Sequence, residues 1–329
     1  MSGARTVVIG TSHWHVPLYA AAMREHHDVV AVTDADPAAA VAGSRMFGAP
    51  ALTEDAILDL PDIELAYVFG RHDSMGARCL ELIRRGVPFV VEKPLGTDLG
   101  TLEEVRDAAA AAGVPATVPL VQRGGPVDAW LRRAGRPVYS RTSFIAGPPE
   151  RYRVNGNPWM LDPVAAGGGC LANLGPHFVD LFLAHVGEGA SLVSSSLRST
   201  MHGEAVEDHA SLVVATGSGR EALIEVGYAF PDAPSKRYCS FTVAGEEGFA
   251  SIDERGQAEL VRKDGRREER RIDVDSDPLY APFVRDVART VARDFDGLPT
   301  LDDLHAAMSI VWAAYRAAGT TTTEGASDR

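Results

Sequence analysis

Residues 6–15 read TVVIGTSHWH, a short β-branched apolar run that ends in a glycine and is followed by a helical stretch over residues 16–26. An unalternating run of this kind is typical of a strand that is buried on both faces. In a dinucleotide-binding fold, a glycine permits the sharp turn from strand to helix, and the helix N-terminus meets the pyrophosphate. The stretch therefore predicts the first strand and the cofactor loop of a doubly wound α/β domain. The loop residues expected against the cofactor are Gly10, Thr11, Ser12, His13 and Trp14.

The same alternation of strand and helix continues through the first third of the chain. Further short apolar runs predict strands at 29–33, 65–69, 88–91 and 116–121, and helical stretches lie between them at 37–47, 74–85 and 98–112. Repeated strand–helix units favour a parallel, doubly wound sheet with right-handed crossovers. We therefore predict a Rossmann domain over residues 1–122.

The pattern changes after residue 122. Strand patterns are expected at 139–146, 191–200, 209–216, 221–230, 237–244, 258–263 and 267–274, with helices at 169–185, 278–294 and 301–317. Several antiparallel strands with a few helices predict an α+β domain with a large open sheet over residues 123–319, which would serve substrate binding and oligomerisation. An uncovered sheet face commonly pairs with a second copy, so we expect a homodimer or homotetramer. Residues 320–329 are expected to be a disordered tail.

Composition excludes several classes of partner and site. The 329-residue chain has a formal net charge of −13, which repels phosphate backbones and anionic lipid and so disfavours nucleic acid and membrane as partners. Its three cysteines, Cys79, Cys170 and Cys239, lie far apart without zinc-site spacing. Unpaired cysteines and the lack of a signal-peptide pattern predict a cytoplasmic protein without a metal site.

The glycine loop departs from the G-x-G-x-x-G fingerprint, because Ser12 and His15 replace its second and third glycines. Asp34 strengthens the prediction that this domain binds a dinucleotide. It ends the second expected strand, where a carboxylate accepts hydrogen bonds from the adenosine ribose hydroxyls. A carboxylate there would repel a 2′-phosphate, which favours NAD over NADP. The alternative is an ordinary turn aspartate. His13 and His15 form an H-x-H pair that could ligate a metal, but later strand ends supply no supporting ligands.

A second candidate site follows the fourth expected strand, where Glu92 and Lys93 precede Pro94. The carboxyl edge of a central strand is where open sheets bind ligands. A half-buried lysine at this edge can hold or donate a proton, because desolvation shifts its equilibrium. The alternative for Glu92 and Lys93 is a strand-end salt bridge.

A third candidate lies downstream, where three glycines, residues 167–169, precede Asn173 and His177. The glycines would let the backbone approach a ligand closely, and residues four apart share one helical face. Pro176 must either start the helix or kink it. If it starts the helix, the positive dipole end would favour a neutral His177 imidazole, which is the form a general base needs. The alternative for His177 is a structural role.

These residues resemble the Gfo/Idh/MocA oxidoreductase family, in which Glu-Lys-Pro follows the fourth strand and a triple glycine precedes Gly-x-His-x-x-Asp. Here those motifs are residues 92–94 and 167–180, and the order of elements is similar over about residues 5 to 317. The resemblance implies a Rossmann domain, an open-sheet second domain and NAD(P)-linked chemistry on sugars, polyols or similar compounds. It implies that Lys93 contacts the reacting hydroxyl and the nicotinamide ribose, and that His177 takes the hydroxyl proton or returns it.

The chain departs from that family in several places. Asn173 stands where many members have an aspartate, so it can orient the substrate or His177 but carries no charge. Thr-Pro-Asn after the third strand is here Gly70, Arg71 and His72, which would still line the nicotinamide side of the cofactor site, and Met75 replaces a usual histidine. Trp159 either walls the substrate pocket or is a core aromatic.

Three functions remain open at this point. The leading hypothesis is a dehydrogenase or reductase that acts on CH–OH groups of a sugar-, cyclitol- or polyol-like substrate. The second is a redox-neutral enzyme that oxidises its substrate transiently with bound NAD. The third is a degenerate, non-catalytic sensor of NAD or a metabolite.

Overall fold

The computed structural model describes residues 3–231 and 236–319, so the expected tail over 320–329 lies outside the described residues. The chain forms two compact units, each described by itself below. The first unit comprises Met1–Leu120, Tyr152–Met160 and Ser276–His305; the second comprises Val121–Arg151, Leu161–Asp275 and Ala306–Arg329. The predicted assignment of residues 1–122 to the cofactor and 123–319 to substrate and oligomerisation stays a prediction.

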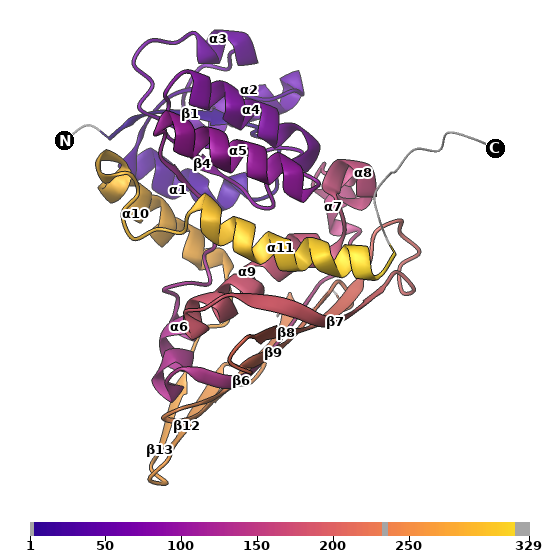
Figure 1. The fold of residues 1–329 in the computed structure, drawn as a ribbon. Helices are drawn as coiled ribbons and strands as arrows, with labels where there is room; N and C mark the ends of the chain where they lie inside the picture. Colours follow the sequence, from indigo (N-terminus) through magenta and orange to yellow (C-terminus); the bar gives the residue numbers. More distant parts are fainter. Residues whose placement is uncertain (1–2, 232–235, 320–329) are drawn as a thin grey trace. The chain divides into compact units, whose positions relative to one another are not determined.

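The first unit contains the predicted parallel sheet of five strands, in the order β2-β1-β3-β4-β5. The strands are β1 (Arg5–Ile9), β2 (Asp28–Thr33), β3 (Leu65–Val68), β4 (Phe89–Val91) and β5 (Ala116–Thr117). The helices between them are α1 (Val16–His26), α2 (Pro37–Phe47), α3 (Glu54–Leu58), α4 (His72–Arg84) and α5 (Leu99–Ala112), and Figure 1 shows α4 and α5 lying side by side. Strand β1 lies between β2 on one side and β3 on the other, so the strand order reverses at β1. The carboxyl ends of β1 and β3 therefore form the topological switch point, which is where such sheets bind ligands.

Local chemistry sets the limits of these helices. The Asp36 carboxylate accepts a hydrogen bond from the Ala38 backbone N–H and so caps α2. The Asp98 carboxylate accepts from the Thr101 N–H at the start of α5, and Gly113 ends that helix with a φ of 63°. Such caps satisfy N–H groups that have no partner within the helix, and a left-handed glycine ends a helix at no steric cost.

The second unit contains eight strands in the order β13-β12-β11-β10-β6-β9-β8-β7. All neighbouring pairs are antiparallel except β6 and β9, which confirms the predicted mostly antiparallel sheet. The strands are β6 (Pro137–Ala146), β7 (Ala190–Arg198), β8 (His209–Thr216), β9 (Glu221–Gly227), β10 (Arg237–Gly245), β11 (Gly248–Ile252), β12 (Gln257–Arg262) and β13 (Arg267–Arg271).

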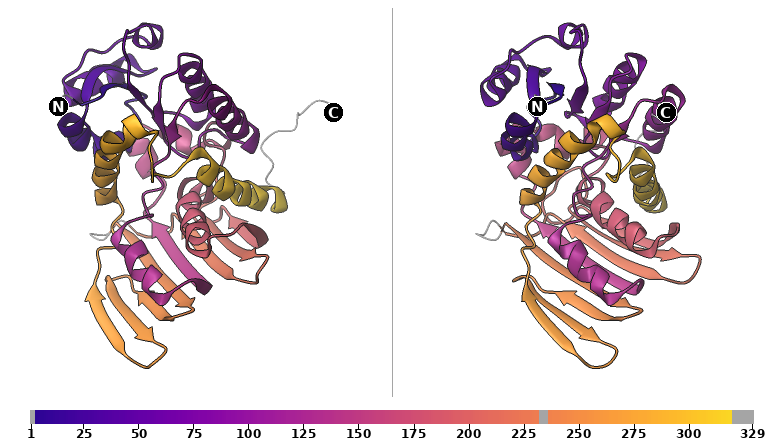
Figure 2. Two further views of the ribbon diagram at one scale, coloured as in Figure 1. Left: turned by 60° about the vertical axis from the view of Figure 1, so that its left-hand side comes forward. Right: turned by 90° about the vertical axis from the view of Figure 1, so that its left-hand side faces the viewer.

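Helix α9 (Cys170–Val186) packs against β6, β8 and β9 on one face of this sheet (Figure 2). Alternate residues of the strands are buried there, as the period of two requires. The Phe178 ring of α9 lies 5.1 Å from the Phe144 ring of β6, measured between centroids. The remaining helices are α6 (Pro126–Leu131), α7 (Arg151–Val154), α8 (Pro163–Ala166), α10 (Tyr280–Thr290) and α11 (Leu301–Ala317), with 3-10 turns at Arg132–Ala134, Pro158–Leu161, Asp277–Leu279 and Val291–Arg293.

Several elements differ from the prediction, including the following three. The strand Gly248–Ile252 was not predicted; it is only five residues long and a turn follows it directly. The strand expected over 116–121 ends at Thr117, because the Thr117 hydroxyl and the Val118 N–H both donate to the Pro299 carbonyl. The helix expected over 278–294 is an α-helix only over Tyr280–Thr290 and continues as a 3-10 turn to Arg293, where the positive φ values of Asp294 and Phe295, 54° and 60°, end it. Among the described residues, no helix combines the length and apolarity that a membrane crossing requires.

Candidate functional site

The first part of the candidate site is the turn after β1. Gly10 has a φ of 85°, and a Cβ atom built on it would lie 2.4 Å from the Phe69 carbonyl oxygen, so only glycine fits. The Asp34 carboxylate, at the end of β2, accepts hydrogen bonds from the Ser12 N–H at 2.6 Å and from the Asp36 N–H at 2.9 Å. The structure thus brings together the glycine turn and the carboxylate that we expect to bind the cofactor ribose.

Side chains brace this loop in place of the missing glycines. The His13 Nδ1 atom accepts a hydrogen bond from the His15 backbone N–H at 3.2 Å, and the Asn157 side-chain amide donates to the Ser12 carbonyl at 3.0 Å. The Thr11 hydroxyl donates to the Ala39 carbonyl at 3.1 Å and so fastens the loop to α2. The loop therefore holds a defined conformation although Ser12 and His15 replace two glycines of the fingerprint.

Four aromatic side chains, His13, Trp14, His72 and Trp159, form what we call the aromatic cluster. The His13 ring stacks on Trp14 with centroids 3.8 Å apart, and Trp159 lies 5.8 Å from Trp14 and 4.9 Å from His72. The Trp159 indole N–H donates to the Asn157 side-chain oxygen at 3.1 Å. Trp159 was predicted as either a pocket wall or a core aromatic, and within the first unit it packs beside the cofactor loop.

The residues that follow β3 differ in burial and in their contacts. Gly70 has a φ of 117°, and His72 is buried at the first position of α4. Arg71 is exposed, and its guanidinium donates two hydrogen bonds to Asp73, at 3.1 and 2.6 Å. His72 therefore joins the aromatic cluster, while Arg71 lies in the ion pair with Asp73.

Glu92 and Lys93 are buried directly after β4, with 1% and 2% of their surfaces exposed. Burial lowers the pKa of Lys93 to about 8, against the opposing charge of Glu92. Burial disfavours an ionised Glu92, but its interactions with His15 and Lys93 outweigh that and hold its pKa well below the usual range. A lysine with this pKa can hold or release a proton near neutral pH.

The partners of Glu92 were not predicted from the sequence. The Tyr19 hydroxyl donates to Glu92 Oε1 at 2.6 Å, and His15 Nδ1 lies 2.9 Å from the same oxygen. Tyr280 lies beside them, with its hydroxyl 3.5 Å from His15 Nδ1. His15 and Tyr19 are four residues apart at the start of α1, so their spacing on one helical face was the available signal.

In the second unit, α9 carries both other predicted catalytic residues. Asn173 and His177 lie one turn apart and are buried, and the Asn173 amide donates to the Tyr228 hydroxyl at 3.1 Å. Because α9 begins at Cys170, Pro176 lies within the helix and His177 is far from its N-terminus. The condition under which the helix dipole would favour a neutral His177 is therefore not met. Asp180, the last residue of the motif, is fully buried and accepts a hydrogen bond from Arg123 at 2.7 Å.

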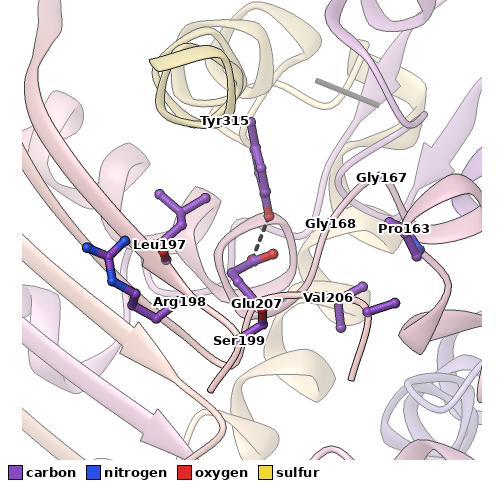
Figure 3. A pocket seen from close by; sticks show the side chains of 10 residues that line it. Pro163, Gly167, Gly168, Leu197, Arg198, Ser199, Val206, Glu207 and Tyr315 are labelled. Carbon is purple, nitrogen blue, oxygen red and sulfur yellow. Dashed lines mark hydrogen bonds between the residues drawn. The ribbon is translucent and has the colours of Figure 1, made fainter. Parts of the chain in front are cut away.

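The start of α9 also shows which side chains require two of the three glycines, while the expected approach of a ligand to these glycines stays a prediction. A Cβ atom at Gly168 would lie 2.1 Å from the Tyr315 hydroxyl oxygen, and one at Gly169 would lie 2.2 Å from the Glu207 carbonyl oxygen. Gly168 and Gly169 are therefore required by Tyr315 and Glu207, which form the buried hydrogen-bonded pair in Figure 3. This pair borders a cavity of about 110 Å³.

Glu207 and Tyr315 also cap the helix. The Glu207 carboxylate accepts from the N–H groups of Gly169 and Leu171, both at 2.8 Å, and from the Tyr315 hydroxyl at 2.6 Å. The Tyr315 oxygen in turn accepts from the Ala172 N–H at 3.0 Å. The N–H groups of Gly169 and Leu171 at the start of α9 are thus satisfied by a carboxylate that lies 38 residues further along the chain than Gly169.

Comparison with known proteins agrees with this architecture. Residues 4–119 match the model of the oxidoreductase family with an NAD-binding Rossmann fold, and residues 132–251 match the GFO/IDH/MocA C-terminal domain. A 1,5-anhydro-D-fructose reductase from Ensifer adhaerens is 27% identical over 225 residues, which cover 66% of this chain and 65% of that protein. The chain thus spans about two thirds of the length of this relative.

Solved structures share the fold at low identity. An oxidoreductase from Agrobacterium radiobacter, solved with NAD+, L-tartaric acid and magnesium, has a TM-score of 0.83 and 17% identity over 97% of both chains. A levoglucosan dehydrogenase, solved with NADH and levoglucosan, has a TM-score of 0.78 and 18% identity over 95% of this chain and 97% of that chain.

Proposed function

Because this chain belongs to the GFO/IDH/MocA oxidoreductase family, whose front domain is an NAD-binding Rossmann fold, we propose that it transfers a hydride between NAD(H) and a carbon of a sugar-like substrate. The reacting carbon bears a hydroxyl or carbonyl group, and the substrate is sugar-, cyclitol- or polyol-like. The relative from Ensifer adhaerens, by name a reductase of a sugar derivative, supports this substrate class.

Residues of the first unit fit the cofactor. The turn at Gly10, the carboxylate of Asp34 at the end of β2 and the aromatic cluster all lie at the carboxyl edge of the parallel sheet. In the proposed site Asp34 binds the adenosine ribose, and Gly70 and His72 line the nicotinamide side. Bound NAD supplies the hydride acceptor or donor.

The observation that carries the proposal is the buried Lys93, which is 2% exposed at the cofactor edge and has its pKa lowered to about 8. Its ammonium donates a hydrogen bond to the reacting oxygen and stabilises the negative charge that develops there. On the second unit, His177 takes the hydroxyl proton when the substrate is oxidised and returns it in the reverse direction. Asn173, held by Tyr228, orients the substrate or His177, and Trp159 walls the substrate pocket.

A direct test follows the absorbance of NADH while the purified protein is offered a panel of sugars, cyclitols and polyols with NAD, and the corresponding carbonyl compounds with NADH. Turnover of at least one member supports the proposal. Failure of NAD and NADP alike to raise the melting temperature would contradict it, since a ligand that binds only the native state must do so. NAD that stays bound through purification and is never released would instead indicate the redox-neutral enzyme.

Activity should fall as the pH rises above about 8. The proposed hydrogen bond from Lys93 to the reacting oxygen requires its protonated form, and the pKa of about 8 means that this form is lost above that pH. We expect kcat/KM to show an alkaline limb near this value, and Lys93→Arg, which stays charged, to retain its residual activity through the limb.

The pKa itself can be measured without substrate. The chain has three lysines, Lys93, Lys236 and Lys263, so lysine labelled with ¹³C at Cε gives few signals, which single Lys→Arg variants assign. A Lys93 signal that titrates near 10.5, the ordinary value, would contradict the proposed role of burial.

Loss of the Asp34 carboxylate should change the choice of cofactor. We expect Asp34→Ala to weaken NAD binding about tenfold while NADP binding changes little or improves, because the carboxylate both binds the ribose hydroxyls and repels a 2′-phosphate. Asp34→Asn keeps an oxygen that can accept from the Ser12 N–H, so it separates the charge from the support of the loop. Calorimetric titration of NAD and NADP measures the effect. An unchanged ratio of the NAD and NADP affinities would show that a residue other than Asp34 recognises the ribose.

A further inference from the structure

The His13 side chain has one ring nitrogen that forms no hydrogen bond within the described residues. The His13 side chain is 1% exposed, and burial together with the charge of His15 holds its pKa well below the usual value, so the ring is neutral. Its Nδ1 accepts a hydrogen bond from the His15 N–H at 3.2 Å, which places the single ring proton on Nε2. That Nε2 is buried and has no hydrogen-bond partner in the described parts of the chain.

Glu92 has a carboxylate oxygen that could accept a hydrogen bond but forms none within the described residues. Its Oε1 is occupied by Tyr19 and His15, whereas its Oε2 is buried and finds no hydrogen-bond partner among residues 3–231 and 236–319. The His13 and Glu92 side chains interact electrostatically, and both contact His15. The other titratable groups around them are Tyr19, His72, Lys93 and Tyr280. A buried polar atom without a partner costs free energy, so this pair of atoms suits a ligand.

We propose that His13 and Glu92 together bind one neutral group that both accepts and donates hydrogen bonds, and that this group is the carboxamide of the nicotinamide ring. The carboxamide oxygen accepts from His13 Nε2–H, and its NH₂ group donates to Glu92 Oε2. The inference rests on the proposed function and assigns the recognition of the reactive end of the cofactor to two named side chains.

The surroundings select this group over others. An ionised Glu92 repels a phosphate or carboxylate, and the N–H of His13 together with the ammonium of Lys93 disfavours a small cation. The His13 ring stacks on Trp14, and Trp159 and His72 continue the aromatic cluster, which suits a flat ring better than a puckered sugar. Both residues follow strands, β1 and β4, that flank β3 at the switch point.

Binding measurements on the whole protein test the proposal without turnover. We would titrate NAD, its 3-acetylpyridine analogue and ADP-ribose by calorimetry. The analogue keeps the carbonyl but has a methyl group in place of NH₂, and ADP-ribose has no nicotinamide. We expect the wild-type protein to bind NAD about tenfold more tightly than the analogue, a difference of about 1.4 kcal/mol.

Two variants of His13 form a matched pair. Asparagine can place its oxygen near the position of Nδ1, so His13→Asn keeps the contact with the His15 N–H and loses the outer donor. Glutamine can place its NH₂ near the position of Nε2, so His13→Gln keeps the donor. We expect the Asn variant to bind NAD and the analogue about tenfold more weakly, the Gln variant to stay near wild type, and ADP-ribose binding to be equal in all three.

Other outcomes overturn the proposal. A larger loss in the Gln variant than in the Asn variant, or a matching loss for ADP-ribose, would mean that His13 acts by supporting the loop. Unchanged NAD binding in the Asn variant, or equal wild-type affinity for NAD and its analogue, would mean that the pair holds another group, such as a substrate hydroxyl. In all of these outcomes the wild-type protein still binds NAD, whereas failure of the wild-type protein to bind NAD would contradict the proposed function itself.

Discussion

Lys93→Ala is expected to lower kcat by about 10³-fold or more, while the binding of NADH changes much less. The variant removes the charge that stabilises the reacting oxygen, and a group that moves or holds a proton in the transition state contributes about 10² to 10⁴ in rate. Lys93 is buried directly after β4, so the lost interaction cannot be replaced by solvent without rearrangement. Steady-state kinetics on an active substrate and fluorescence titration of NADH separate the two effects.

Lys263→Ala is the matched control for this experiment. Lys263 lies in the turn between β12 and β13 of the second unit, where its loss should leave both kcat and stability unchanged. Circular dichroism and the melting temperature of each variant show whether the fold survives. A Lys93→Ala protein that is folded and turns over at the wild-type rate would remove this residue from the mechanism.

The parallel sheet was predictable because each of its strands carries its own signal. Strands such as Phe89–Val91 are apolar without alternation, and the intervening helix Leu99–Ala112 carries both an N-cap aspartate and a terminal glycine. The eight-stranded sheet was predicted less completely. Strand Gly248–Ile252 is defined by its pairing with strands on both sides, which depends on register in space and not on local composition.

In the candidate site, too, features with a local sequence signal were predictable, whereas contacts between distant residues were not. The positions of Gly10, Asp34 and Lys93 at the carboxyl edge of the parallel sheet could be predicted because each residue follows an apolar strand pattern, while their roles stay predictions. The Glu92–His15–Tyr19 contacts join positions 73 to 77 residues apart, so the spacing of His15 and Tyr19 on one helical face could not identify Glu92 as their common partner. His15 was interpreted as a lost glycine, but in the structure it is a hydrogen-bonding partner of Glu92.

Glu207→Ala is expected to lower the free energy of unfolding by about 3–5 kcal/mol. The change removes the acceptor for the Gly169 and Leu171 N–H groups and for the Tyr315 hydroxyl, and each buried donor left without a partner costs about 1–3 kcal/mol. Chemical denaturation measures the loss. A change below about 1 kcal/mol would mean that α9 does not depend on this cap.

Tyr315→Phe provides a graded control. It leaves the Glu207 carboxylate and its two backbone bonds in place and removes one acceptor, that of the Ala172 N–H, so we expect a smaller loss of about 1–2 kcal/mol. Because the two side chains share a hydrogen bond, the double variant should be less destabilised than the sum of the single variants.

The pH dependence of this stability has a defined sign. Burial raises the pKa of Glu207 above that of an unfolded glutamate, although Tyr315 and the backbone N–H groups oppose the shift. A carboxyl group whose pKa is raised by folding contributes stability that is fully present below the unfolded pKa and is lost as the pH rises through the folded pKa. The stability difference between wild type and Glu207→Gln should therefore shrink as the pH rises above about 4.5, the ordinary value. Because α9 also carries Asn173 and His177, the Gln variant should keep more of the proposed activity than the Ala variant, since it retains an acceptor for the first turn of the helix.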